Sequence, residues 1–120
     1  MPSNKTPTGL NAWKIQDIPT RLRVQVVAHS VVRSITVSEV ALEIITTFLN
    51  NTDNKEEIKE RYMPYVIVAG ELSTDWQVKQ FPNSVRKRTN TAAKEMNITV
   101  SVLMQIIIMH WQSGRTESNK

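Results

Sequence analysis

The chain has 120 residues, no cysteine, a formal net charge of +4 at pH 7 and a sequence pI near 9.6. This length allows one domain or two very small ones, and the absence of cysteine excludes a disulfide framework and a thiolate metal site. No apolar run is long enough to span a bilayer and no signal-peptide pattern opens the sequence, so we expect a cytoplasmic protein.

The first element expected is a short strand preceded by a flexible arm. Residues 1–11 are rich in proline, serine and threonine, which is typical of an unstructured arm. Trp13–Gln16 alternates apolar and polar residues, which predicts a strand, and Pro19 ends it at the start of a helix. We expect this helix over Thr20–Arg33. Its inward residues are expected to be Leu22, Val26, Val27 and Ser30.

A second helix is expected to begin at Thr36. Threonine is a good N-cap residue because its hydroxyl accepts from the unpaired N–H groups of the first helical turn. Ser34 lies where the first helix must stop, and Ile35 then returns to the core. The apolar residues that follow at helical spacing are Val37, Val40, Ala41, Ile44, Ile45 and Phe48.

Residues 51–74 form a connector whose net charge of −2 differs from the +1 and +3 of residues 12–50 and 75–112. A polyanion would be attracted by the two basic regions and repelled by the connector, although a solvated basic face gives the same balance. Asp53-Asn54-Lys55-Glu56 has the form of a capping box and predicts a helix to about Tyr62, which Pro64 ends. Tyr65–Ala69 is apolar, and either a buried strand or a buried helix fits its composition.

The region Trp76–Trp111 repeats the region Trp13–Phe48 without a gap, with 9 of 36 aligned positions identical. The matches include tryptophan and proline at offsets that helical patterning does not require, which favours one unit used twice over convergent patterning. Half of this chain is too short for a sufficient core of its own, so we expect the copies to share one. A lone short strand must pair, and its natural partner is the strand of the other copy, antiparallel across a pseudo-twofold axis.

The second copy therefore predicts a strand at Trp76–Lys79, a helix over Asn83–Met96 and a helix over Thr99–Gln112. Asn97 tolerates the left-handed conformation that a helix stop often needs. The inward residues of the first of these helices are expected to be Val85, Thr89, Ala92, Ala93 and Met96. The expected organisation is an arm (1–11), a first repeat (12–50), the connector (51–74), a second repeat (75–112) and a flexible tail (113–120).

The residues from Pro19 to Thr47, with Thr36-Val37-Ser38-Glu39-Val40-Ala41-Leu42, resemble the ribbon-helix-helix DNA-binding family, which includes the Arc and MetJ repressors and the CopG-type regulators. The spacing from Pro19 to Thr36, repeated from Pro82 to Thr99, is similar to that of Arc. The resemblance covers about two-thirds of the chain, and the tandem arrangement is similar to TraY-type conjugation accessory proteins. It implies a mostly helical fold with a short antiparallel two-stranded ribbon, built from two ribbon-helix-helix repeats in one chain.

In that family the ribbon lies in the DNA major groove, where each base pair presents a distinct pattern of donors and acceptors. The resemblance implies base contacts from Lys14, Gln16, Gln77 and Lys79, since lysine suits guanine and glutamine suits adenine. It implies phosphate contacts from the starts of the second helices, at Thr36, Val37, Ser38, Thr99, Val100 and Ser101. Salt-sensitive affinity that does not depend on base sequence would come from Arg21, Arg23, Arg86, Lys87 and Arg88. Because the copies hold lysine and glutamine in opposite order, the two DNA half-sites are expected to be related but not identical.

One feature departs from the family pattern. Counting back from each proline, the family places apolar residues one, three and five positions earlier, whereas here they lie one, four and six positions earlier. An extra residue near Asp17 and near Gln80, forming a β-bulge, would restore the alternation. Without bulges the groove-facing residues would be Trp13, Ile15 and Asp17, which suit DNA poorly.

The expected function is therefore sequence-specific binding of double-stranded DNA, as a repressor or a plasmid or mobile-element accessory factor associated with the nucleoid. The alternative is a protein-interaction module, such as an antitoxin-like protein. It would use Ile106, Met109 and the Tyr65–Ala69 segment, which either cover one another or bind a second chain. Two chains could also exchange repeats.

Catalysis is not expected from this sequence. No nucleophile, metal cluster or glycine-rich phosphate loop is present, so we expect neither an enzyme nor a cofactor. His29 and His110 are isolated, and Trp13 and Trp76 are expected in the core rather than stacked on bases.

Overall fold

The computed structural model describes residues 10–51, 54–66 and 73–118, which are mostly helical with a two-stranded antiparallel sheet. The predicted cap at Asp53, residues 67–69 of the apolar connector segment and most of the predicted arm lie outside the described residues. The elements in order are β1 (Leu10–Pro19), α1 (Thr20–Arg33), α2 (Val37–Asn51), α3 (Lys55–Tyr62), the 3-10 helix η1 (Met63–Tyr65), β2 (Ser73–Pro82), α4 (Asn83–Glu95) and α5 (Val100–Ser118).

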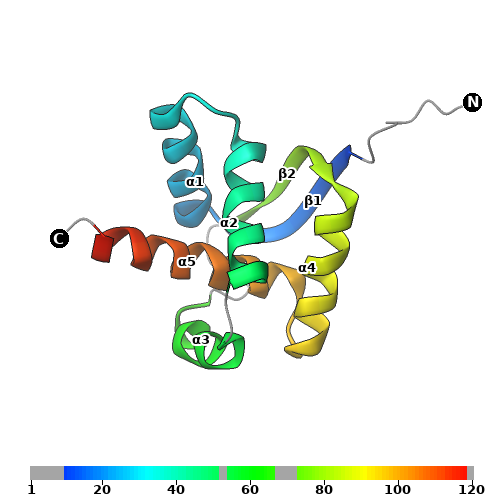
Figure 1. The fold of residues 1–120 in the computed structure, drawn as a ribbon, viewed down its shortest axis with the longest axis vertical. Helices are drawn as coiled ribbons and strands as arrows, with labels where there is room; N and C mark the ends of the chain where they lie inside the picture. The colour runs from blue at the N-terminus through cyan, green and yellow to red at the C-terminus, as the bar shows by residue number, and fades with distance from the viewer. Residues whose placement is uncertain (1–9, 52–53, 67–72, 119–120) are drawn as a thin grey trace, which may run out of the picture.

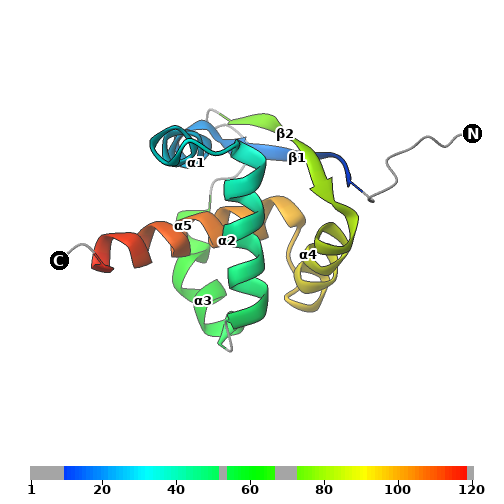
Figure 2. The same cartoon turned by 45° about the horizontal axis from the view of Figure 1, so that its top comes forward.

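The two strands form one side of the molecule, and the helices fill the space beneath them. Figure 2 shows the sheet across the top, α1 and α4 at its opposite ends, and α2 and α5 crossing below it. The helix α5 packs on β1, and α2 packs on β2. The helix α3 packs against α5 on the side away from the sheet (Figure 1). The helices thus cover one face of the sheet, and no described helix packs on the other, which we call the open face.

The covered face of the sheet carries six apolar residues, three from each strand, as the alternating pattern predicted. None of them is more than 3% exposed, and the rings of Trp13 and Phe81 lie 4.9 Å apart. The six residues are Trp13, Ile15, Ile18, Trp76, Val78 and Phe81. Both tryptophans therefore belong to the core, and exposing their rings would forfeit a large part of the apolar burial.

The strands are longer than predicted, because pairing continues past the alternating segments to Leu10 opposite Pro82 and to Pro19 opposite Ser73. The expected boundaries at residues 11 and 74 therefore fall inside strands. At the other end of the chain, α5 continues to Ser118 instead of ending at Gln112.

Both predicted bulges are confirmed. The first bulge lies in β1, where the strand has one extra residue between Ile15 and Ile18. The second lies in β2, where the strand has one extra residue between Val78 and Phe81. Asp17 and Gln80 have φ of 55° and 54°, the left-handed conformation of an extra bulge residue. Each bulge lets two apolar residues three positions apart, such as Ile15 and Ile18, face the same core.

The helix stops are also confirmed. Ser34 and Asn97 have φ of 59° and 60°. The N–H of the next residue then reaches back along the helix: Ile35 donates to the Ser30 carbonyl and Ile98 to the Ala93 carbonyl, each at 3.0 Å. This arrangement satisfies carbonyls at the helix end and reverses the chain sharply.

The connector covers the extra apolar face of α5. Ile106 is 0% exposed, and Ile58 of α3 is 2% exposed in the same core. Of the two alternatives for Ile106, a cover within the chain or contact with a second chain, the structure has a cover within the chain, in which α3 packs against α5.

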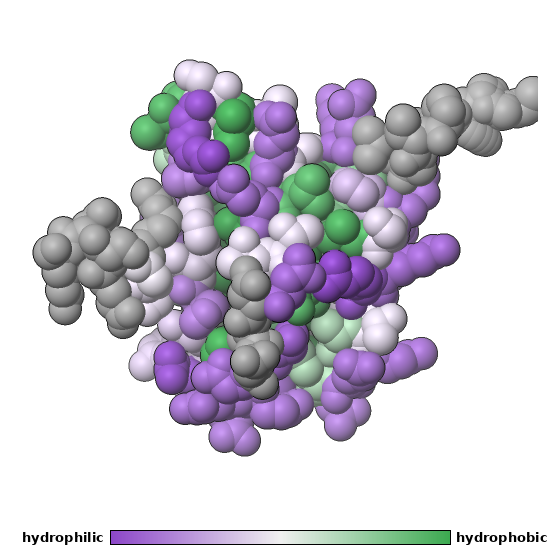
Figure 3. Space-filling view, viewed as in Figure 1, coloured by the Kyte–Doolittle hydropathy of each residue, from purple (hydrophilic) through white to green (hydrophobic). Residues whose placement is uncertain are grey.

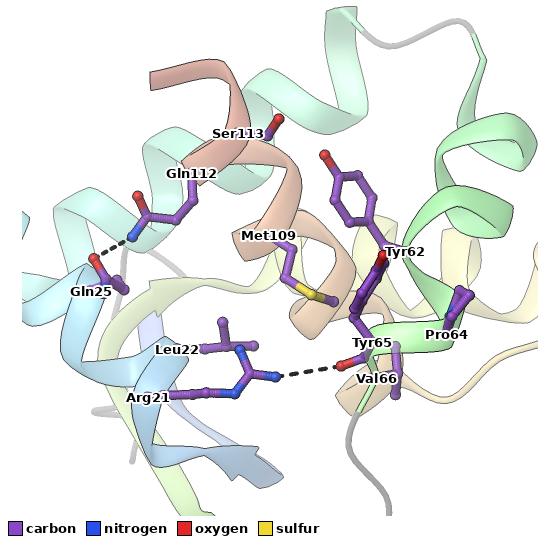
Figure 4. A pocket seen from close by; sticks show the side chains of 10 residues that line it. All are labelled: Arg21, Leu22, Gln25, Tyr62, Pro64, Tyr65, Val66, Met109, Gln112 and Ser113. Atoms are coloured by element: carbon purple, nitrogen blue, oxygen red, sulfur yellow. Dashed lines mark hydrogen bonds between the residues drawn. The ribbon is translucent and has the colours of Figure 1, made fainter. Parts of the chain in front are cut away.

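The apolar connector segment was expected to be buried, but its first residue is exposed. Tyr65 is 63% exposed, and Met109 lies half-buried beside it in an open cavity of about 820 Å³ between α1, η1 and α5 (Figure 4). Among the described residues, no single helix is long and apolar enough to cross a membrane, although α4 and α5 pass that test together with a bend of 99° between them.

Candidate nucleic-acid interface

The open face of the sheet brings together the four residues predicted to contact bases. Lys14, Gln16, Gln77 and Lys79 are all exposed, on the face opposite the buried tryptophans. Lys14 and Gln77 lie directly opposite one another in the register. The four side chains therefore form one polar surface along the ribbon, as the alternation predicted.

A fifth polar residue of this surface, Asp75, was not predicted. Its Oδ2 lies 3.5 Å from Lys14 Nζ, and its Oδ1 accepts a hydrogen bond from the backbone N–H of Asp17 at 3.3 Å. An exposed ion pair is worth at most about 1 kcal/mol, so Lys14 can exchange this carboxylate for another acceptor. The sequence did contain a signal for Asp75, because the alternation of polar and apolar residues in this strand extends to the residue before Trp76.

The start of α2 is capped as predicted. Thr36 Oγ1 accepts from the Glu39 N–H at 3.0 Å, and Glu39 Oε1 accepts from the Thr36 N–H at 2.8 Å, which together form a capping box. The start of α5 has the simpler cap, in which Thr99 Oγ1 accepts from the Val102 N–H at 3.1 Å. The first N–H groups of a helix have no acceptor within it, so those of Val37 and Val100 remain directed out of the helix starts.

The start of α2 borders a cleft of about 490 Å³ between α1, α2 and the ribbon. The cleft joins a helix N-terminus, an arginine and the polar side of β2, three features that favour an anion. Its lining residues are Arg23, Val27, Thr36, Val37, Ser38, Trp76, Gln77, Val78, Lys79 and Gln80.

The start of α5 borders a second cleft, of about 350 Å³, between α4, α5 and the other strand. It has the same three components, with Arg86 as its arginine. Its lining residues are Trp13, Lys14, Ile15, Gln16, Asp17, Arg86, Asn90, Thr99, Val100 and Ser101. All six residues predicted to hold phosphate thus line one cleft or the other.

The hydroxyl groups of the two serines at the helix starts are hydrogen-bonded within the chain. The Ser38 hydroxyl donates to the Lys79 carbonyl, and the Ser101 hydroxyl donates to the Asp17 carbonyl at 3.2 Å. A hydroxyl has one proton, so neither can donate to a phosphate while it makes this bond. The serines instead fasten each helix start to a bulge in a strand, and an anion in the cleft would meet their backbone N–H groups.

Three of the five predicted basic contacts lie elsewhere. Arg21 donates to the Tyr65 carbonyl at 3.4 Å and lines the cavity beside η1 (Figure 4). Lys87 and Arg88 line another cavity with Glu95, and Arg88 donates to the Asn50 side chain. Basic residues close together in sequence point in different directions around a helix, which a count of charges does not reveal.

Among the residues described, no group of three histidine, aspartate or glutamate side chains is placed to hold a metal. The two histidines make ring contacts: His29 lies edge-on to Trp111 at 5.1 Å, and His110 lies edge-on to Phe48 at 6.2 Å. These contacts are those of packed side chains.

No protein-family profile, no curated protein sequence and no solved structure matches this chain significantly.

Proposed function

We propose that the chain is a sequence-specific double-stranded DNA-binding protein of the ribbon-helix-helix type, in which one polypeptide supplies both strands of the ribbon and all four helices that support it. Two matched clefts at the ribbon carry this proposal. The proposal has three parts: a duplicated unit, a phosphate clamp at each end of the ribbon, and a base-reading surface between the clamps.

The duplicated unit is supported by the register of the strands. Adding sixty-three to a residue of the first repeat gives its counterpart in the second, as Trp13 gives Trp76. Under this rule the pair Trp13–Val78 becomes the pair Ile15–Trp76, and the pair Lys14–Gln77 becomes itself. A pseudo-twofold axis through the Lys14–Gln77 pair accounts for the whole register.

The phosphate clamp is supported by the two clefts, whose linings correspond residue for residue under the same rule. Arg23 corresponds to Arg86, and the helix start at Thr36 corresponds to that at Thr99. A positive helix terminus beside an arginine attracts phosphate, and two such sites flanking a ribbon would hold the DNA backbone on both sides of the groove. We therefore assign phosphate contacts to the backbone at Val37, Ser38, Val100 and Ser101 and to Arg23 and Arg86.

The base-reading surface is supported by the exposure of the central ribbon residues. A two-stranded ribbon fits the major groove, in which lysine can donate to guanine and the glutamine amide can pair with adenine. The two ends of this surface differ, because exposed Ala12 of the first repeat corresponds to Asp75 of the second. A carboxylate accepts from the amino group of cytosine, whereas alanine suits the thymine methyl group. The half-sites are therefore expected to differ at this position as well.

Such a protein would act as a transcriptional repressor or as an accessory factor on plasmid or other mobile DNA, associated with the nucleoid in the cytoplasm. Binding would need no cofactor, because the contacts are made by side chains and backbone N–H groups alone. Clamps held by arginine would also make the affinity fall steeply with salt.

The test is a selection of binding sequences from random duplexes, followed by affinity measurements on the selected duplex and on scrambled duplexes. Lys14→Ala and Lys79→Ala should each cost about 1–3 kcal/mol of discrimination between the two duplexes. Arg86→Ala should weaken binding to both duplexes by similar factors. Failure to enrich any sequence would contradict sequence-specific binding, and an equal loss on all duplexes from Lys14→Ala would contradict the assigned reading surface.

A further inference from the structure

The helix α1 exposes a continuous apolar stripe. Val24, Val27, Val31 and Val32 are 53%, 37%, 72% and 82% exposed, and Ala28 between them is also exposed. Positions spaced three, four, seven and eight residues apart lie on one side of a helix. Figure 3 shows the corresponding hydrophobic surface at the upper left, over α1.

The fold does not require this stripe. The core-facing side of α1 is a different one, formed by Leu22, Val26 and Ser30. A helix that is apolar on two sides is typical of one buried on both. Under the same offset of sixty-three residues, the outer side of α4 is polar and charged throughout. The residues that replace the stripe there are Lys87, Asn90, Thr91, Lys94 and Glu95.

The spacing of residues in the stripe is symmetric about its centre. Val24 and Val32 lie four residues on either side of Ala28. If two copies of α1 cross antiparallel at Ala28, each Val24 meets the Val32 of the other copy, and the small alanine at the centre allows the helices to approach closely. Contact between identical patches across a twofold axis is the commonest form of self-association.

The charge at the rim of the stripe is already compensated. The guanidinium of Arg33 is hydrogen-bonded and ion-paired to Glu43. The hydrogen bond to Glu43 raises the pKa of Arg33, and the charge of the carboxylate adds to this effect. A second copy would therefore meet a pair of opposite charges at this end of the stripe and not an isolated positive charge.

We propose that the stripe Val24, Val27, Ala28, Val31 and Val32 is the contact through which two copies of this chain pair, α1 against α1. One side of a 14-residue helix provides less than the roughly 800 Å² per partner of a standard interface, so the pair is weak when free. Since α4 at the opposite end of the sheet is polar, association closes at two copies and does not continue into a filament. If the proposed function holds, the pair also sets two ribbons on neighbouring sites of one duplex.

The direct test is sedimentation velocity without DNA, which does not depend on the proposed function. The wild-type protein should shift from monomer to dimer between about 1 μM and 1 mM, the range of weak specific contacts. Val31→Lys, which introduces the residue type of the corresponding α4 position, should remain monomeric throughout. Thr91→Lys places the same charge on the outer side of α4 and should dimerise as the wild type does. Circular dichroism should show all three proteins equally folded.

The second test measures binding to duplexes that carry one or two copies of the selected sequence. Wild type should bind the second site about 5–150-fold more tightly than the first, the usual range for coupled sites, and Val31→Lys should lose this factor while keeping its affinity for one site. A wild-type monomer at all concentrations, larger assemblies, or undiminished pairing of Val31→Lys would overturn the proposed contact. Normal pairing without binding to any duplex would instead overturn the proposed function.

Discussion

The phosphate clamp proposed at each end of the ribbon makes a quantitative prediction about the salt dependence of DNA binding. The double variant Arg23→Ala/Arg86→Ala removes one cation from each cleft. The matched control Lys87→Ala/Arg88→Ala removes the same total charge from residues that line a different cavity. Both variants have a formal net charge two units below the wild-type +4. A difference between them therefore reports where the charges lie and not how many there are.

The size of the expected change in salt dependence follows from the number of phosphates that the arginines neutralise. Each phosphate contact on double-stranded DNA contributes about −0.9 to the slope of log affinity against log salt concentration. Two clefts with one arginine each should make the slope about 1.8 units shallower in the cleft variant. The two arginines lie in clefts at different strands of the ribbon, so each single variant should account for about half of the change.

The assay is fluorescence anisotropy with a labelled duplex at a series of salt concentrations, run in parallel for wild type, cleft variant and control. The control should keep the wild-type slope and lose only a small, general part of its affinity. If both double variants flatten the slope equally, the clefts are not phosphate sites and the charge acts only at long range.

Three further predictions concern the elements that build the site. Thr36→Ala should lower the free energy of unfolding by about 1–2 kcal/mol in urea denaturation, and by more than Thr99→Ala, because the Thr36 hydroxyl also donates to Glu39 Oε1 at 3.2 Å, whereas the residue three positions after Thr99 is a valine; equal losses would show that this hydroxyl–carboxylate bond contributes nothing. Gln80→Val should destabilise by about 1–2 kcal/mol, since a β-branched residue resists positive φ, whereas Gln80→Gly should not destabilise; tolerance of valine would mean that the bulge can relax. Ile106→Ala should cost about 2–5 kcal/mol and leave the sedimentation behaviour unchanged, whereas a loss of pairing without a loss of stability would place Ile106 in an interface after all.

The local elements could be predicted from the amino-acid sequence, because the signals for each lie within a few residues of one another. The helix at Thr20–Arg33 has the bounds that its pattern predicts, and the left-handed stops and threonine caps occur where predicted. The bulges could be predicted because an apolar residue displaced by one position from strict alternation has no other way to reach the core. The polar face of the ribbon followed from the same alternation.

The contacts between residues far apart in the chain could not be predicted from the sequence, because they arise when the elements pack together. Arg21 and Arg23 are two positions apart, yet one binds the connector and the other lines a cleft, because helical geometry turns them about 200° from each other. The sequence left open whether the connector or a second chain covers Ile106, and the packing of α3 against α5 buries it within the chain. The hydroxyls of Ser38 and Ser101 donate to strand carbonyls that are distant in sequence, which the pattern of the helix starts does not indicate. Such contacts depend on how the elements pack, and the spacing of residues within one helix or strand does not show which other element will pack against it.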